Sequence, residues 1–141
     1  LLSACVKAGM SFGIASPDGY QMDHGLLEHA RRGAAGTGLS VVSCTDPGEA
    51  VAGADVVYTD VWTSMGQESE QSEREKAFAG YQVNAELLRR AKPTAVVMHC
   101  LPAHRGSEIT DEVMDGPQSV VFQQAENRLH TIKALLVATL A

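Results

Sequence analysis

Two apolar runs in the sequence each end in side chains that can do chemistry. Residues 55–59, DVVYT, are followed by Asp60, and residues 95–98, AVVM, are followed by His99 and Cys100. If both runs form parallel strands of one sheet, their carboxyl ends share an edge, which is where such sheets bind ligands. A carboxylate from Asp60 and a thiol from Cys100 would then meet at a substrate pocket.

Each of these side chains also has a purely structural explanation. An Asp after a strand is often a helix N-cap, and a free Cys is commonly a small buried hydrophobe. We interpret His99 as a core histidine. No metal site is expected, because His99 and Cys100 are adjacent and no further residues with zinc-ligand spacing accompany them. No cofactor is expected either, because the glycines of residues 9–13 and 33–38 lack the order of a dinucleotide-binding fingerprint.

The elements that must position these residues alternate between short apolar runs and helical patterns. This alternation predicts an α/β fold, with a parallel sheet and helices on both faces, Rossmann-like and doubly wound. The expected strands are 11–15, 39–43, 55–59, 95–99 and 119–122, and the expected helices are 1–8, 22–35, 47–52, 84–91, 110–114 and 124–140.

Residues 64–79, SMGQESEQSEREKAFA, interrupt the alternation. They are rich in Glu and Ser and show no sustained apolar face, so we expect a loop with at most a helical turn. A loop of this length in a compact domain is usually either functional or disordered.

Composition narrows the class of protein. The 141 residues are 45% hydrophobic and 20% charged, which is ordinary for one globular domain. The net charge of -6, with scattered basic residues, argues against a nucleic-acid surface. Three widely spaced cysteines fit reduced thiols, and no run is long and apolar enough for a membrane span. A cytoplasmic protein with small-molecule partners is expected.

Several motifs together resemble the ornithine carbamoyltransferase family. They are GIASPDGYQMD at 13–23, DVWTSMGQE at 60–68, GYQVN at 80–84, HCLPAHRG at 99–106 and FQQAENRLHTIKALL at 122–136. The resemblance covers essentially the whole chain, residues 1–141, as the second, ornithine-binding domain. The family's S-T-R-T, H-P-x-Q and G-D-G-N-N segments are expected before Leu1, so the first strand of this domain and the carbamoyl phosphate domain are expected to lie outside the chain.

The resemblance implies a reaction between an amine and carbamoyl phosphate. The δ-amino group of ornithine attacks the carbamoyl carbon, giving citrulline and phosphate. An alkyl amine with a pKa of about 10.4 must first lose a proton at neutral pH. The resemblance implies that Asp60, Ser64, Met65 and Cys100 bind ornithine, with Asp60 and Cys100 catalytic. Whether Cys100 is the base or an orienting ligand is open.

Carbamoyl phosphate has its own implied contacts, which are Cys100, Leu101 and Arg128. Pro102 disfavours the α region for Leu101, so we expect an extended backbone that points the Leu101 carbonyl toward the carbamoyl NH₂. The guanidinium of Arg128 offers a planar fork of donors. Its structural alternative is a surface pair with Glu126.

Further expectations concern assembly and alternatives. Residues 132–141 are apolar nearly all round, so the last helix is expected to pack on a partner outside the chain, and the family implies a homotrimer. The polar stretch 66–77 would close over ornithine. The resemblance fixes no role for His104 or Arg105. Two other functions stay open: a carbamoyltransferase for another amine or acetylornithine, and a binding module without catalysis.

Overall fold

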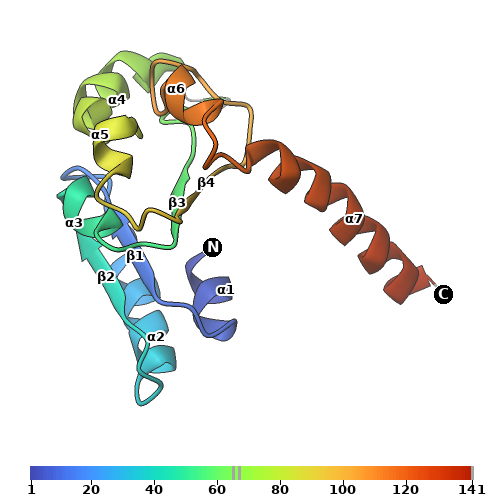
Figure 1. Ribbon diagram of the computed structural model, residues 1–141. Coiled ribbons are helices and arrows are strands. Elements are labelled where there is room, and N and C mark those ends of the chain that lie inside the picture. The colour runs from blue at the N-terminus through green and yellow to red at the C-terminus, as the bar shows by residue number, and fades with distance from the viewer. Residues whose placement is uncertain (65, 67, 141) are drawn as a thin grey trace. The chain divides into compact units, whose positions relative to one another are not determined.

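The computed structural model describes residues 1–64, 66 and 68–140, and they form two compact units, Leu1–Ala52 and Gly53–Ala141 (Figure 1). Each unit contains a pair of parallel strands with helices around it. The predicted α/β class and the predicted parallel pairing are confirmed.

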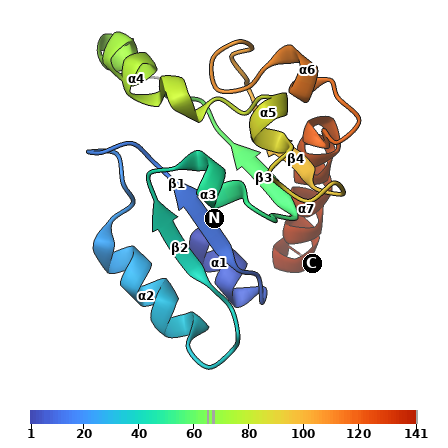
Figure 2. The same cartoon turned by 60° about the vertical axis from the view of Figure 1, so that its left-hand side comes forward.

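The first unit is built on strands β1 and β2, which pair in parallel from Phe12 opposite Val41 to Ala15 opposite Cys44 (Figure 2). Its elements are α1 (Leu2–Lys7), β1 (Phe12–Ala15), α2 (His24–Ala34), β2 (Val41–Cys44) and α3 (Pro47–Val51). They lie where the sequence predicts them, within a few residues at each end.

Helices cover both faces of this strand pair. Phe12 packs against the buried core of α1, α2 and β2, which includes Leu27 and Val41. Successive residues of a strand point to opposite faces, so Gly13 faces the other way. There a Cβ on Gly13 would lie 3.2 Å from the Ala50 carbonyl oxygen of α3. The glycine therefore lets α3 approach the strand closely.

The second unit is built on β3 and β4, whose parallel register runs from Val56 opposite Val96 to Thr59 opposite His99. Its buried core includes Val57, Val97 and Ile109. The elements are β3 (Val56–Thr59), η1 (Glu68–Glu70), α4 (Gln71–Phe78), η2 (Ala79–Tyr81), α5 (Ala85–Leu88), β4 (Val96–His99), α6 (Asp111–Met114) and α7 (Val121–Leu140).

The expected loop at residues 64–79 is wrong for its second half, which is helix α4. The helix has no buried residue, so its sequence has no apolar stripe from which a helix could be predicted. Local side-chain pairs stabilise it instead: Arg74 lies 2.9 Å from Glu70, and Gln71 donates to Glu75 at 2.7 Å. At its end Phe78 stacks on Trp62, with ring centroids 6.1 Å apart.

The expected strand at residues 119–122 is also wrong. Only Ser119 forms a β-bridge, opposite Val97 of β4, and helix α7 already begins at Val121. The Gln124 amide donates to the Val120 carbonyl at 2.8 Å, which starts the helical hydrogen-bond pattern. The apolar residues of this run belong to the buried start of a helix, and periodicity over so few residues does not separate the two cases.

Helix α7 exposes most of its apolar side chains. Leu129, Ile132, Leu135, Leu136, Val137 and Leu140 are each at least half exposed. The far half of the helix extends beyond β4 and α6 of its own unit (Figure 1). Among the described residues, no helix is long and apolar enough to cross a membrane.

Candidate active site

The register of β3 and β4 brings the two predicted side chains together. Thr59 pairs with His99, so Asp60 and Cys100 follow at the same edge of the pair. The Cys100 thiol donates a hydrogen bond to the Asp60 carboxylate and receives one from the Tyr58 hydroxyl. Asp60 Oδ1 also accepts from the Val61 amide at 2.7 Å, which fixes the carboxylate.

The environment of Cys100 keeps its thiol protonated. Burial raises the pKa of the Cys100 thiol above 9.0, and the hydrogen bond to Asp60 raises it further, whereas the hydrogen bond from Tyr58 lowers it. A thiol with a raised pKa carries little thiolate at neutral pH. The sulfur therefore presents a neutral, polarizable ligand beside the carboxylate group of Asp60.

His99, the last residue of β4, is buried with 1% of its surface exposed, as the sequence predicts for a core histidine. Its Nδ1 accepts a hydrogen bond from the Leu101 amide at 2.9 Å. The ring proton therefore sits on Nε2, which donates to Glu108 Oε1 at 3.1 Å. This pair ties the backbone after Cys100 to a carboxylate in the following loop.

Glu108 is a site residue that sequence reasoning missed. Its side chain is fully buried, and Oε1 also accepts from the His104 amide at 2.6 Å. Oε2 has no hydrogen-bond partner among the described residues. A Glu in a polar loop is normally exposed, so nothing in the local sequence signals this burial.

The expected extended backbone at Leu101 is wrong. Leu101 has a φ of 57°, and its peptide bond to Pro102 is cis. The positive φ places Leu101 in the left-handed region of backbone conformations. In this conformation the Leu101 amide donates to His99 Nδ1. A sharp bend thus follows Cys100 directly.

Arg128 reaches this bend from the first turns of α7. Its Nη1 donates to the Cys100 carbonyl at 3.5 Å. Glu126, the alternative partner expected for Arg128, lies 3.5 Å from His130. Arg105 instead points to α6, where its Nη1 contacts Asp111 at 2.7 Å and Asp115 at 2.6 Å.

Ser64 lines a pocket of about 320 Å³, and Met65 lies outside the described residues. His104, to which the resemblance gives no role, also borders this pocket. Its lining consists of Trp62, Thr63, Ser64, Gln71, Glu75, His104, Ser107 and Glu108.

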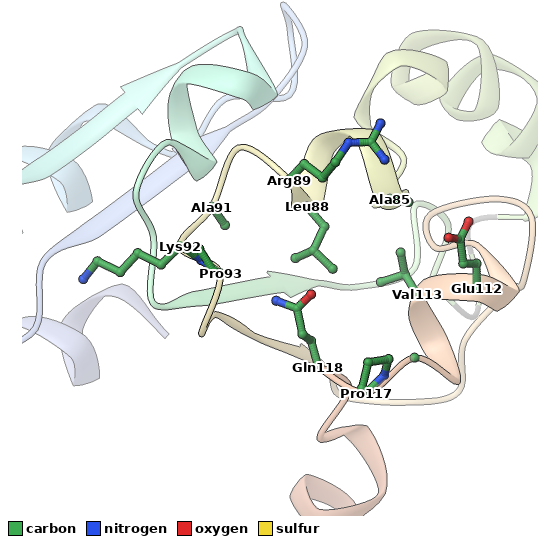
Figure 3. A pocket seen from close by; sticks show the side chains of 11 residues that line it. Ala85, Leu88, Arg89, Ala91, Lys92, Pro93, Glu112, Val113, Pro117 and Gln118 are labelled. Atoms are coloured by element: carbon green, nitrogen blue, oxygen red, sulfur yellow. The ribbon is translucent and has the colours of Figure 1, made fainter.

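A second pocket, of about 430 Å³, lies between α5 and α6, and none of the predicted site residues borders it (Figure 3). Leu88, Val113 and Gln118 border its interior, whereas the Lys92 side chain points away (Figure 3). Lys92 is held by Asp55 at 2.7 Å. The described residues contain no group of three side chains suited to a metal ion.

Comparison with known proteins decides the family. Residues 1–139 match the model of the aspartate/ornithine carbamoyltransferase family, Asp/Orn binding domain. The chain belongs to this family.

Relatives within the carbamoyltransferase family cover the chain throughout. The ornithine carbamoyltransferase of Symbiobacterium thermophilum is 56% identical over 100% of the chain and 46% of its own length. That of Geobacillus stearothermophilus is 57% identical over 99% of the chain and 45% of its own length. The crystal structure of the enzyme from Gloeobacter violaceus superposes with a TM-score of 0.89 at 48% identity, over 100% of the chain and 46% of its own. The chain thus spans less than half the length of these relatives.

Proposed function

We propose that this chain supplies the ornithine half of a carbamoyltransferase site, which transfers a carbamoyl group from carbamoyl phosphate to the δ-amino group of L-ornithine. The observation that carries the proposal is the hydrogen-bonded pair of Asp60 and Cys100 at one edge of β3 and β4. A carboxylate beside a neutral thiol suits an ammonium group that must be held and then deprotonated.

Asp60 is the proton acceptor in this mechanism and Cys100 the orienting ligand. The ornithine ammonium binds the Asp60 carboxylate and gives up a proton there, while the sulfur fixes the direction of the nitrogen lone pair. Cys100 does not act as a free thiolate base, because its raised pKa leaves too little thiolate at neutral pH. Ser64 and Met65 bind the amino-acid end of ornithine.

Arg128 and Leu101 act on the other substrate. The Arg128 guanidinium, beside the Cys100 carbonyl, binds the oxygens of carbamoyl phosphate, and its charge offsets the negative charge that develops on the leaving phosphate. The Leu101 carbonyl accepts from the carbamoyl NH₂. The remaining phosphate contacts belong to residues outside these 141.

The rest of the assembly follows the same proposal. The exposed apolar face of α7 packs on the carbamoyl phosphate domain of the full-length protein, and the complete enzyme is a homotrimer. The free thiols of Cys5, Cys44 and Cys100 fit a reducing compartment, the cytoplasm.

A hybrid enzyme tests the function. The 141 residues replace the matching part of the Geobacillus stearothermophilus enzyme, to which they are 57% identical. We expect this hybrid to form citrulline from ornithine and carbamoyl phosphate. A hybrid that folds and forms no citrulline contradicts the proposal. A hybrid that uses acetylornithine in place of ornithine would instead support the alternative of an acetylornithine carbamoyltransferase.

The Asp60→Asn substitution in the hybrid tests the proposed role of the carboxylate. It removes a charged partner of the amine, so we expect kcat/KM for ornithine to fall by about 10- to 100-fold, with carbamoyl phosphate binding little changed. Asp55→Asn is the matched control, because Asp55 precedes the same strand at its other end and pairs with Lys92. Equal losses for both substrates would contradict the role of Asp60.

A further inference from the structure

We propose that the Tyr58 hydroxyl is a positioning group for the Cys100 thiol, and that Gln124 of α7 holds this hydroxyl in place. The consequence for catalysis rests on the proposed function, whereas the contact itself does not. The family resemblance gives neither residue a role.

Strand geometry places Tyr58 on the correct side of the site. Tyr58 pairs with Met98 across β3 and β4. Because side chains two residues apart in a strand share a face, Tyr58 and Asp60 lie on one side, as do Met98 and Cys100. The sulfur therefore lies within reach of both a hydroxyl and a carboxylate, and it forms a hydrogen bond with each.

Gln124 connects the hydroxyl to the backbone that carries the thiol. Its Oε1 accepts from the His99 amide at 3.0 Å, and its Nε2 donates to the Tyr58 hydroxyl oxygen at 3.5 Å. One amide group thus spans from the residue preceding Cys100 to the phenol that contacts it. The position of the sulfur is fixed from two sides.

The direction of the phenolic proton follows from these contacts. A hydroxyl has one hydrogen to donate, and the oxygen of Tyr58 already accepts from Gln124. Its hydrogen is therefore free to point at the sulfur.

In this arrangement Tyr58 and Asp60 have different roles at the Cys100 sulfur. Tyr58 stabilises electron density on the sulfur, and the Asp60 carboxylate accepts the S–H hydrogen bond when no substrate is bound. An ornithine amine that displaces the thiol from Asp60 meets a sulfur still held by Tyr58. The nitrogen is then oriented without any movement of the backbone at Cys100.

The Tyr58→Phe variant tests this inference through the reactivity of the thiol. Alkylation of Cys100 by iodoacetamide is followed across a pH series, with each cysteine read separately by peptide mass spectrometry. The variant lacks the donor, so we expect alkylation at pH values below the thiol pKa to slow by about three- to tenfold, with the same rate at high pH. Cys44, in the other unit, is the internal control and should not change.

Two more variants sharpen the outcome. Asp60→Asn removes the group that raises the thiol pKa, so we expect faster alkylation, opposite in sign to Tyr58→Phe. Gln124→Leu releases the phenol and should slow alkylation less than Tyr58→Phe does. An unchanged pH profile for Cys100 in Tyr58→Phe overturns the inference, and so does an equal change at Cys44.

The two proposals fail separately. Alkylation uses no substrate, so a hybrid that forms no citrulline defeats the proposed function and leaves the thiol measurement standing. If the hybrid is active, Tyr58→Phe should lower kcat for ornithine and shift its pH profile. An active hybrid with an altered thiol but unaltered kcat and pH profile would contradict the catalytic consequence.

Discussion

The buried pair of His99 and Glu108 stabilises the backbone beside Cys100. Both side chains are fully buried, and Glu108 Oε1 accepts from the His99 ring and from the His104 amide. Removal of one partner from a buried pair leaves the other unsatisfied, which costs more than the interaction is worth in itself.

Two substitutions at Glu108 separate its role as an acceptor from its charge. Glu108→Ala leaves the His99 and His104 N–H groups without an acceptor, so we expect the free energy of unfolding to fall by about 3–5 kcal/mol. Glu108→Gln keeps the carbonyl oxygen and should cost less than about half of that. Urea unfolding measures both, with the exposed Glu112→Ala as control. A Gln variant as unstable as the Ala variant would show that the charge itself is required.

For individual residues of the candidate site, the sequence predicts some contacts and misses others. Asp60 and Cys100 each follow an apolar strand, so their meeting follows from parallel pairing alone. Glu108 and Gln124 reach the site from a loop and from a helix, and their positions depend on how those segments pack in three dimensions. Reasoning from the ends of strands therefore finds Asp60 and Cys100 and misses the residues that hydrogen-bond to the backbone beside them.

The two halves of helix α7 differ in how deeply their side chains are buried. Its first turns contain the buried Val121, and Gln124 and Arg128, which hydrogen-bond to the backbone of His99 and Cys100. By contrast, Leu135 and Leu136 are 57% and 50% exposed. An apolar face of this kind is expected to be covered by another surface.

Polar substitutions on the far half of α7 test that expectation. In the 141-residue chain, Leu135→Gln with Leu136→Gln should change the free energy of unfolding by less than about 0.5 kcal/mol per site, because little burial is lost. In the hybrid enzyme we expect the same two substitutions to lower thermal stability clearly, because under the proposed contact the carbamoyl phosphate domain covers the helix. Equal effects in both proteins would contradict the proposed contact.

Prediction of elements from the sequence succeeds where an apolar pattern exists. The strands at Val56–Thr59 and Val96–His99 are continuous apolar runs, and both are found. Helix α4 forms without such a pattern, through pairs such as Arg74 with Glu70, so it was missed. At residues 119–122 four apolar or small side chains fit either a strand or a buried helix start, and the hydrogen bonds with β4 and within α7 decide.

Across the whole chain, stability is distributed over two cores. Leu2, Leu27 and Val41 belong to the core of Leu1–Ala52, and Val57 and Val97 are buried within Gly53–Ala141. Asp60 and Cys100 both come from the second unit, where each directly follows a strand of the β3–β4 pair.

Truncation of a core leucine shows what the first unit needs. Leu27→Ala should cost about 2–4 kcal/mol and lower the hydrogen-exchange protection of Phe12–Ala15 and Val41–Cys44. Leu26→Ala is the matched control on the same helix, because Leu26 is 56% exposed and Leu27 only 5%. Unchanged protection of the two strands in Leu27→Ala would contradict the core described for this unit.

The contact between β4 and the start of α7 affects how far Arg128 lies from Cys100. Val97 of β4 hydrogen-bonds to the backbone of Gln118 and Val120, so the segment that enters α7 runs beside the strand that precedes Cys100. The separation between the Arg128 guanidinium and the Cys100 carbonyl then depends on the tilt of α7. A change in that tilt would therefore widen or narrow the space between the guanidinium and the backbone of Cys100.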